Sequence, residues 1–227
     1  MDRALLNRYV NLPTTIVSDV LRSAGAPHQV LHHSLQRFGA ARPFAAPAFC
    51  VRGERVLGAM KASDDRRFEL YERFPDGAVL VLDSGGYEPA VVFGENVALA
   101  LKMQGCMAIV TDGGIRDRDA FSEMQMAVWA KFVTPLSSGK QWITTQIDVP
   151  VTLPGQSSST VTIYSGDIVH ADSDGVVIVP GRGAVSILED AEVVAGIESE
   201  TRRRLKAGEK AAVVYGDLPR FSHVRKI

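Results

Sequence analysis

Three charged residues in one stretch of the chain have the types and the spacing that could form a reactive site. Glu95 is a carboxylate, and twenty residues separate it from the adjacent pair Arg116 and Asp117. A carboxylate can move protons, a guanidinium can hold an anion, and an aspartate oxygen suits a hard divalent cation. The three groups can act together only if the intervening chain brings Arg116 and Asp117 back to the position of Glu95.

The pattern of the intervening residues predicts this return. Residues 78–83 are continuously apolar up to the final aspartate, which is typical of a buried parallel strand. Residues 94–105 predict a helix with an acidic first turn and a glycine stop, and residues 107–111 predict the next buried strand. A strand, a crossover helix and a parallel strand form a right-handed unit, and ligands bind beyond the carboxyl ends of such strands. We therefore expect Glu95 and the Arg116–Asp117 pair to meet at one sheet edge.

The start of the predicted helix offers a binding site for an anion. The helix begins at Gly94, so the N–H groups of about Asn96 and Val97 have no partner within it. These groups and the positive end of the helix dipole suit a substrate carboxylate. Glu95, in the same turn, could act as a base directly or through a water molecule.

Arg116 and Asp117 have different expected roles in the site. Arg116 could hold a carboxylate or a developing oxyanion in its planar fork. Asp117 could bind Mg²⁺ or Mn²⁺ as a single oxygen ligand, with waters in the other positions. The residues alone leave a structural alternative open, in which Arg116 and Asp117 form a turn salt bridge and Glu95 only favours the helix dipole.

The same pattern resembles the RraA-like family, which includes the class II 4-hydroxy-4-methyl-2-oxoglutarate (HMG/CHA) aldolases and the regulator of ribonuclease E activity. The resemblance rests on GE followed after twenty residues by RD, set in DGGIRD, and it extends over roughly residues 15–208. The other segments that resemble the family are TIVSD at 15–19, VLDSGG at 81–86, AVWAK at 127–131 with TP at 134–135, GDIV at 166–169 and ADSDGVVIVP at 171–180.

The resemblance implies a fold and an assembly. The fold would be a single RraA-like α/β domain over residues 1–227, of the compact β/β/α swivelling type, with a central mixed sheet and flanking helices. The assembly would be a homotrimer or homohexamer with its sites at subunit interfaces. In the aldolases of the family, a C-terminal glutamate of a neighbouring subunit reaches the water shell of the metal, and Glu198 is the residue here that matches it.

The resemblance also implies a function. The protein would be a divalent-metal-dependent class II aldolase or decarboxylase that cleaves a 4-carboxy-2-oxo acid, such as 4-hydroxy-4-methyl-2-oxoglutarate or oxaloacetate, to pyruvate. Arg116 and a Mg²⁺ or Mn²⁺ ion on Asp117 would stabilise the pyruvate enolate. Glu95 would position or deprotonate a water molecule that transfers the proton. The alternative is a non-catalytic regulator that binds and inhibits an RNA-degrading enzyme. The length of the chain and the predicted helix at residues 184–207 favour the aldolase.

The composition of the chain limits the classes of protein to which it can belong. The 227 residues are 46% hydrophobic and 22% charged, which is enough for one well-formed core. The net charge of −1 gives no electrostatic reason to expect nucleic acid or an anionic membrane as a partner. Cys50 and Cys106 are isolated, which favours a reducing compartment, and the first residues do not resemble a signal peptide. We expect a soluble cytoplasmic protein with no membrane span.

Three other motifs predict structure rather than chemistry. The histidines at 28, 32 and 33 lie in a predicted loop or strand with no supporting cysteine or glutamate, so zinc is not expected. The sequence DSGG at 83–86 resembles the nucleophile motif of trypsin-like proteases, but the upstream chain is largely helical, and we expect a glycine turn instead. The sequence DSDG at 172–175 lacks the later acidic ligands of a calcium loop and predicts a hairpin.

The rest of the chain predicts elements around this site. Helices are expected at residues 2–10, 14–25, 63–73 and 184–207. Strands are expected at 128–130 and 176–179, as an antiparallel pair at 147–153 and 160–164, and as two strands within 45–60 that turn near 52–54. Residues 118–126 and 136–146 are expected to be a polar connection and a polar loop, and residues 209–227 a tail that packs on a partner.

Overall fold

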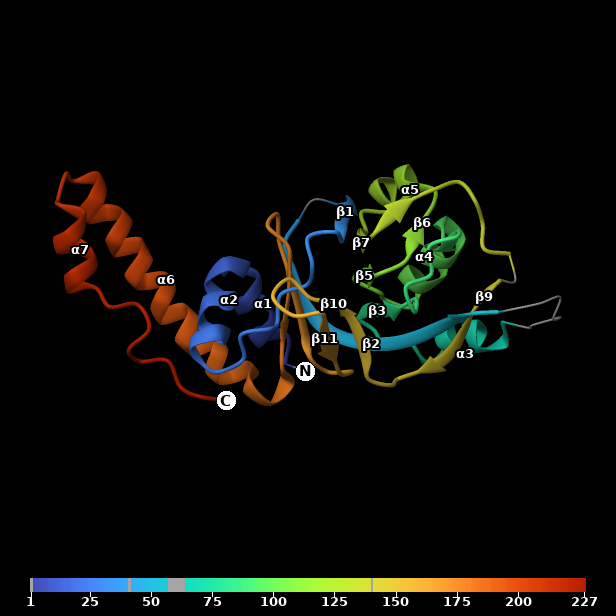
Figure 1. Cartoon of the computed structure of the whole chain (residues 1–227), viewed down its shortest axis with the longest axis horizontal. Coiled ribbons are helices and arrows are strands. Elements are labelled where there is room, and N and C mark those ends of the chain that lie inside the picture. The colour runs from blue at the N-terminus through green and yellow to red at the C-terminus, as the bar shows by residue number, and fades with distance from the viewer. Residues whose placement is uncertain (1, 41, 57–63, 140) are drawn as a thin grey trace.

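A computed structural model describes residues 2–40, 42–56, 64–139 and 141–227 of the chain (Figure 1). The helices among them are α1 (Arg3–Val10), α2 (Thr14–Ser23), α3 (Asp65–Arg73), α4 (Glu95–Met103), α5 (Arg118–Glu123), α6 (Ala184–Lys206) and α7 (Ala211–Asp217), with a 3₁₀ turn at Gly181–Gly183. The strands are β1 (Gln36–Gly39), β2 (Phe44–Arg55), β3 (Val79–Asp83), β4 (Val91–Phe93), β5 (Ala108–Thr111), β6 (Gly114–Ile115), β7 (Ala127–Ala130), β8 (Phe132–Val133), β9 (Trp142–Ile147), β10 (Val151–Pro154), β11 (Thr160–Ile163), β12 (Ile168–Ala171) and β13 (Val176–Val179).

A mixed sheet lies at the centre of the fold. Its strand order is β1-β7-β5-β3-β2-β12-β13, and β9 also pairs with β2. The four strands β2, β3, β5 and β7 run parallel to their neighbours among themselves, whereas β1, β9, β12 and β13 pair antiparallel. The predicted α/β fold with a central mixed sheet and flanking helices is confirmed.

The central strands are apolar throughout because both of their faces are covered. All five residues of β3 are buried. Leu80 and Leu82 belong to the hydrophobic cluster under α3, α4 and α5, whereas Val79 and Val81 face a second cluster that includes β10 and β11. This alternation between two covered faces explains why the sequence shows a continuous apolar run instead of a polar and apolar repeat.

A third apolar cluster joins the N-terminal and C-terminal helices to the sheet. Side chains of α1, α2 and α6 pack on Ile168, Val177 and Val179 of β12 and β13. Figure 1 shows α6 running away from the sheet, with α7 beside its far end. The tail contacts its own chain at its end, and its predicted packing on a partner stays a prediction. The N–H of Ile227 donates to the carbonyl of Ala24 at 3.1 Å.

A second, smaller sheet positions the site. The strands β4, β6 and β8 form a three-stranded parallel sheet in that order. Each of these strands has only two or three residues, and none of them was predicted from the sequence. Because the strands are parallel, the segments that follow them begin at the same edge.

Three predicted segments differ from the structure. Residues 44–55 form one strand without a turn, and the rest of the predicted pair, residues 57–60, lies outside the described residues. The glycine at 53 marks a bulge and a close approach, since a Cβ there would lie 2.0 Å from the ring of Trp142. Residues 118–123 form α5, which is anchored by buried Phe121 and is too short to show a helical repeat. Residues 142–147 form β9, in which Trp142 and Thr144 point inward.

Candidate active site

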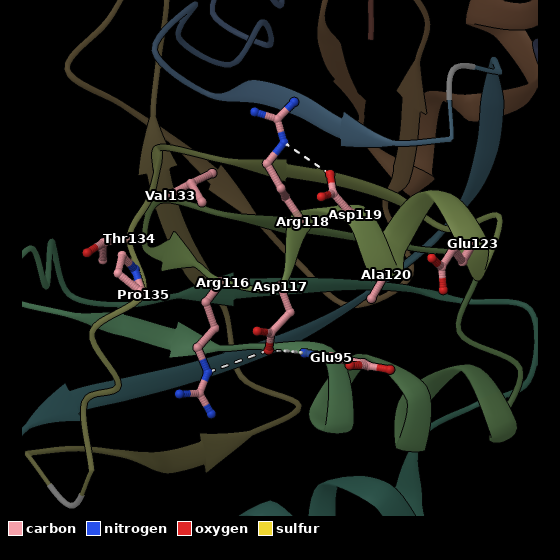
Figure 2. Close-up of a pocket in the computed structure, with 10 residues that line it drawn as sticks. All are labelled: Glu95, Arg116, Asp117, Arg118, Asp119, Ala120, Glu123, Val133, Thr134 and Pro135. Atoms are coloured by element: carbon pink, nitrogen blue, oxygen red, sulfur yellow. Dashed lines mark hydrogen bonds and ion pairs between the residues drawn. The ribbon is translucent and has the colours of Figure 1, made fainter.

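A cavity of about 560 Å³ lies at the carboxyl ends of β4, β6 and β8. The helix α4 begins after β4 at Glu95, the pair Arg116 and Asp117 follows β6, and Thr134 and Pro135 follow β8. Figure 2 shows these side chains around one hollow. The lining residues are Glu95, Arg116, Asp117, Arg118, Asp119, Ala120, Glu123, Val133, Thr134 and Pro135. The predicted convergence of Glu95 with Arg116 and Asp117 therefore occurs, but at the edge of the smaller sheet and not of the central one.

Asp117 stands at the centre of this arrangement in an unusual backbone conformation. Its φ of 60° and ψ of 40° are left-handed, which aspartate tolerates better than most side chains. The N–H of Glu95 donates to Asp117 Oδ2 at 3.1 Å, and Arg116 Nε lies 3.6 Å from the same oxygen. No described residue donates a hydrogen bond to Asp117 Oδ1, so this oxygen is available to a ligand.

Gly94 makes room for the two charged side chains. A Cβ at this position would lie 2.5 Å from Asp117 Oδ2 and 2.8 Å from Arg116 Cγ. No side chain larger than hydrogen fits between α4 and the segment after β6 unless Arg116 or Asp117 moves. Gly94 was predicted to be part of the substrate site. It does not line the cavity, but its missing side chain leaves the space that Arg116 and Asp117 occupy.

The predicted anion-binding N–H groups are present at the start of α4. No described residue accepts a hydrogen bond from the N–H of Asn96 or of Val97, whereas the N–H of Glu95 is already used by Asp117. The Asn96 side chain is exposed, and the Val97 side chain packs against the apolar cluster beneath the helix. Neither residue is among those that line the cavity, which begins at the neighbouring Glu95, so a contact between their N–H groups and a ligand stays a prediction.

The charges of the cavity favour a cation. Four of its lining residues are carboxylates and two are arginines, which gives a formal charge of −2. The described residues contain no cluster of three His, Cys, Asp or Glu side chains that could enclose a metal. Asp117 alone fits Mg²⁺ or Mn²⁺, because such ions accept one or two carboxylates and keep several waters. The donor set would suit a hydrated ion that keeps most of its water shell, and the presence of such an ion stays a prediction.

Glu198 lies elsewhere in the same chain. It is on α6, where it pairs with Arg202 at 3.2 Å and with Arg220 at 3.0 Å. Figure 1 places α6 on the other side of the central sheet from α4 and α5. A contact between Glu198 and the metal shell would require a neighbouring subunit, and this role stays a prediction.

Several residues that line the cavity were not predicted from the sequence. Arg118, Asp119 and Glu123 lie on α5, a helix that was not predicted. Thr134 and Pro135 belong to a segment that resembles the family, and no role was predicted for them. Their position directly after a parallel strand would have placed them at the site had β8 been recognised.

Comparison with known proteins places the chain in a family. Residues 14–178 match the RraA-like family, described as Aldolase/RraA. The chain belongs to this family. Proteins of Burkholderia mallei and Burkholderia pseudomallei with the provisional name 4-hydroxy-4-methyl-2-oxoglutarate aldolase are 31% identical to this RraA-like protein over 159 residues, which is 69% of this chain and 87% of theirs.

Solved structures share the fold of this RraA-like protein. One, described as belonging to novel cellulases from microbes of the gut ecosystem, has a TM-score of 0.81 with 26% identity and covers 88% of this chain and 87% of its own. Another, from Streptomyces coelicolor, is described as an unusual member of the RNase ES inhibitor RraA protein family. Its TM-score is 0.77 with 24% identity, and it covers 89% of this chain and 98% of its own.

The remaining motifs of the RraA-like protein have structural roles. In the DSGG turn, Ser84 Oγ accepts the N–H of Tyr87 at 3.2 Å, and Asp83 is buried against Arg52. Asp112 accepts the N–H groups of Ser84 and Gly86, and burial raises the pKa of this carboxyl above its usual value. None of the described helices combines the length and the apolar character that crossing a bilayer requires.

The histidine cluster and the DSDG sequence also make their contacts within the chain. His28 Nδ1 lies 3.0 Å from Ser157 Oγ and His33 Nδ1 lies 3.1 Å from Gln156 Oε1, so both rings have protein partners. Asp172, in the predicted hairpin between β12 and β13, accepts both the N–H and the hydroxyl of Thr14 at the start of α2. This turn therefore caps a helix.

Proposed function

We propose that this RraA-like protein is a divalent-metal-dependent class II aldolase that cleaves a 4-carboxy-2-oxo acid to pyruvate, with oxaloacetate decarboxylation as a related activity. One observation carries the proposal. Three short parallel strands bring Glu95, Arg116 and Asp117 to a single cavity, and these groups are what enolate chemistry needs. The aldolase name of relatives that are 31% identical supports the same conclusion.

Each group has a part in the proposed reaction. The unpaired N–H groups of Asn96 and Val97 bind the 1-carboxylate of the substrate at the positive end of α4. Arg116 faces the oxygen on which negative charge develops when the carbon–carbon bond breaks. Asp117 holds the Mg²⁺ or Mn²⁺ ion, which supplies further positive charge for that oxygen when bound. Glu95 holds the water that accepts and returns the proton.

The charge of the cavity makes the reaction depend on the cation. The substrate is a dianion at neutral pH, and the cavity has a formal charge of −2 from its own side chains. Coulomb repulsion therefore opposes substrate binding until a divalent cation neutralises the site. We expect substrate affinity to rise steeply with the concentration of Mg²⁺ or Mn²⁺.

The test is pyruvate release from oxaloacetate and from 4-hydroxy-4-methyl-2-oxoglutarate. Release should require Mg²⁺ or Mn²⁺ and stop with EDTA, with the metal in buffer as the control for spontaneous decarboxylation. Arg116→Ala should lower turnover about 10²- to 10³-fold while the fold survives, because its exposed ion pair with Asp117 contributes little to stability. A protein that releases no pyruvate with any metal would instead favour the regulatory alternative, which binding to an RNA-degrading enzyme would then test.

A further inference from the structure

The cavity contains a second arginine that the proposed mechanism does not use. Arg116 and Arg118 both line it, and Figure 2 shows them extending in opposite directions from either side of Asp117. The hollow therefore has a guanidinium group at each of two walls, with the Asp117 carboxylate between them. A ligand whose developing oxyanion faces Arg116 and whose distal carboxylate faces Arg118 matches this charge distribution.

Arg118 is available to bind a ligand. Its ion pair is with Asp119, at 3.9 Å, and the two side chains are 65% and 98% exposed. An exposed pair at that distance contributes little energy. The guanidinium carbon lies 5.8 Å from the centre of the Phe38 ring on β1, a contact that restricts the side chain without using its hydrogen-bond donors. Arg118 thus keeps a full set of donors at the rim of the site.

We propose that Arg118 binds the distal carboxylate of the substrate and thereby makes aldol cleavage, not decarboxylation, the principal reaction of this site. The inference rests on the proposed function and adds a substrate-discriminating residue to it. The substrate class is a 2-oxo acid that has a hydroxyl group and a second carboxylate on C4.

The two reactions treat the distal carboxylate differently. In aldol cleavage the C3–C4 bond breaks, its electron pair goes to C3 as the enolate, and the C4 hydroxyl loses its proton to the water on Glu95 as the C4 carbonyl forms. The distal carboxylate keeps its charge throughout, so its contact with Arg118 survives to the transition state and beyond. The enolate then takes a proton at C3 and becomes pyruvate.

In oxaloacetate decarboxylation the same bond breaks, but C4 leaves as neutral CO₂. The negative charge of the distal carboxylate passes to the enolate, so Arg118 loses its partner as the reaction proceeds. A contact that is stronger in the ground state than in the transition state slows the chemical step. Arg118 should therefore assist cleavage of the hydroxy acid and hinder decarboxylation.

The experiment compares Arg118→Ala with the unmodified protein on three reactions in the presence of Mn²⁺. They are cleavage of 4-hydroxy-4-methyl-2-oxoglutarate, decarboxylation of oxaloacetate, and exchange of the pyruvate methyl protons with deuterium, which needs the enolate but no distal carboxylate. For cleavage we expect the variant to lower kcat/KM about 10- to 100-fold, mainly through KM, as loss of a charged hydrogen bond predicts. For decarboxylation kcat should stay level or rise, and exchange should change less than about twofold.

A matched control removes the same charge elsewhere. Arg22→Ala loses an exposed arginine on α2, which pairs there with Asp19, and it should leave all three reactions unchanged. If Arg118→Ala lowered kcat/KM by the same factor in all three reactions, or did not lower it in cleavage, the proposed role of Arg118 would be overturned. Absence of proton exchange in the unmodified protein would overturn the proposed function itself and this inference with it.

Discussion

Replacing Gly94 by alanine should disturb the site while leaving the backbone unstrained. Gly94 has φ −144° and ψ −160°, an extended conformation that alanine also adopts. The new Cβ would meet Asp117 Oδ2 at 2.5 Å and Arg116 Cγ at 2.8 Å. Both contacts are with flexible side chains, so these side chains would move and the strand would keep its place.

The size of that movement sets the expected effect. Ordinary contact begins at 3.4 Å, so Asp117 Oδ2 must retreat by about 0.9 Å. The hydrogen bond from the Glu95 N–H, now 3.1 Å long, lengthens or breaks, at a cost of about 1 kcal/mol in the free energy of unfolding. A displacement of about 1 Å at a reacting group can lower the rate about 10²-fold. Gly94→Ala should therefore lose about two orders of magnitude in kcat/KM but little stability.

The assay measures three quantities on the same variant: pyruvate release, Mn²⁺ affinity by calorimetry, and unfolding in urea. The matched control is Gly196→Ala on α6, where an added Cβ meets nothing within 4 Å. This control should keep full activity and gain up to about 1 kcal/mol in stability, since alanine favours helix. Wild-type activity and metal affinity in Gly94→Ala would refute the idea that the position of Asp117 governs the chemistry.

Three further predictions concern charged and titrating groups. Asp117→Asn should keep the left-handed backbone and the stability but lose Mn²⁺ binding by calorimetry, whereas Asp117→Ala should also unfold about 1 kcal/mol more easily in urea. Arg52→Ala leaves the carboxylate of Asp83 buried without its cation, and it should cost about 3 kcal/mol by urea unfolding while activity per folded molecule stays normal. Burial lowers the pKa of His170 in the folded chain. As the pH drops below about 6.5, the unfolded chain therefore binds a proton at this histidine before the folded chain does, and the free energy of unfolding should fall. In His170→Asn, urea midpoints measured at pH 8, 6.5 and 5 should show a flatter dependence, and an unchanged slope would contradict this assignment.

The sequence predicts well those elements whose burial is visible in the residue pattern. The run at 78–83 is apolar because both faces of β3 are covered, and the helix that starts at Glu95 follows a glycine and has an acidic first turn. The long helix α6 and the hairpin at 172–175 follow from equally local signals. These elements were sufficient to predict that Glu95 and the Arg116–Asp117 pair meet.

The missed elements are short or are decided by distant contacts. A strand of two residues such as β6 or β8 has no periodicity to detect, because it is defined only by its neighbours. Gly53 suggests a turn in the sequence, but in the structure the ring of Trp142 occupies the space of its missing side chain. That contact joins residues almost ninety positions apart, and no local pattern contains it.

The conformation of Asp117 explains how two adjacent residues serve one cavity. In an extended strand, neighbouring side chains point to opposite faces, so Arg116 and Asp117 after β6 would be expected to separate. The left-handed turn at Asp117 ends the strand and directs its carboxylate back to the N–H of Glu95, where Arg116 Nε is 3.6 Å away. Gly94 is required at the point where these side chains cross α4. The site therefore depends on one strained residue and one absent side chain, and the spacing between Glu95 and Arg116 is the length of chain that α4, β5 and β6 need to bring the two together.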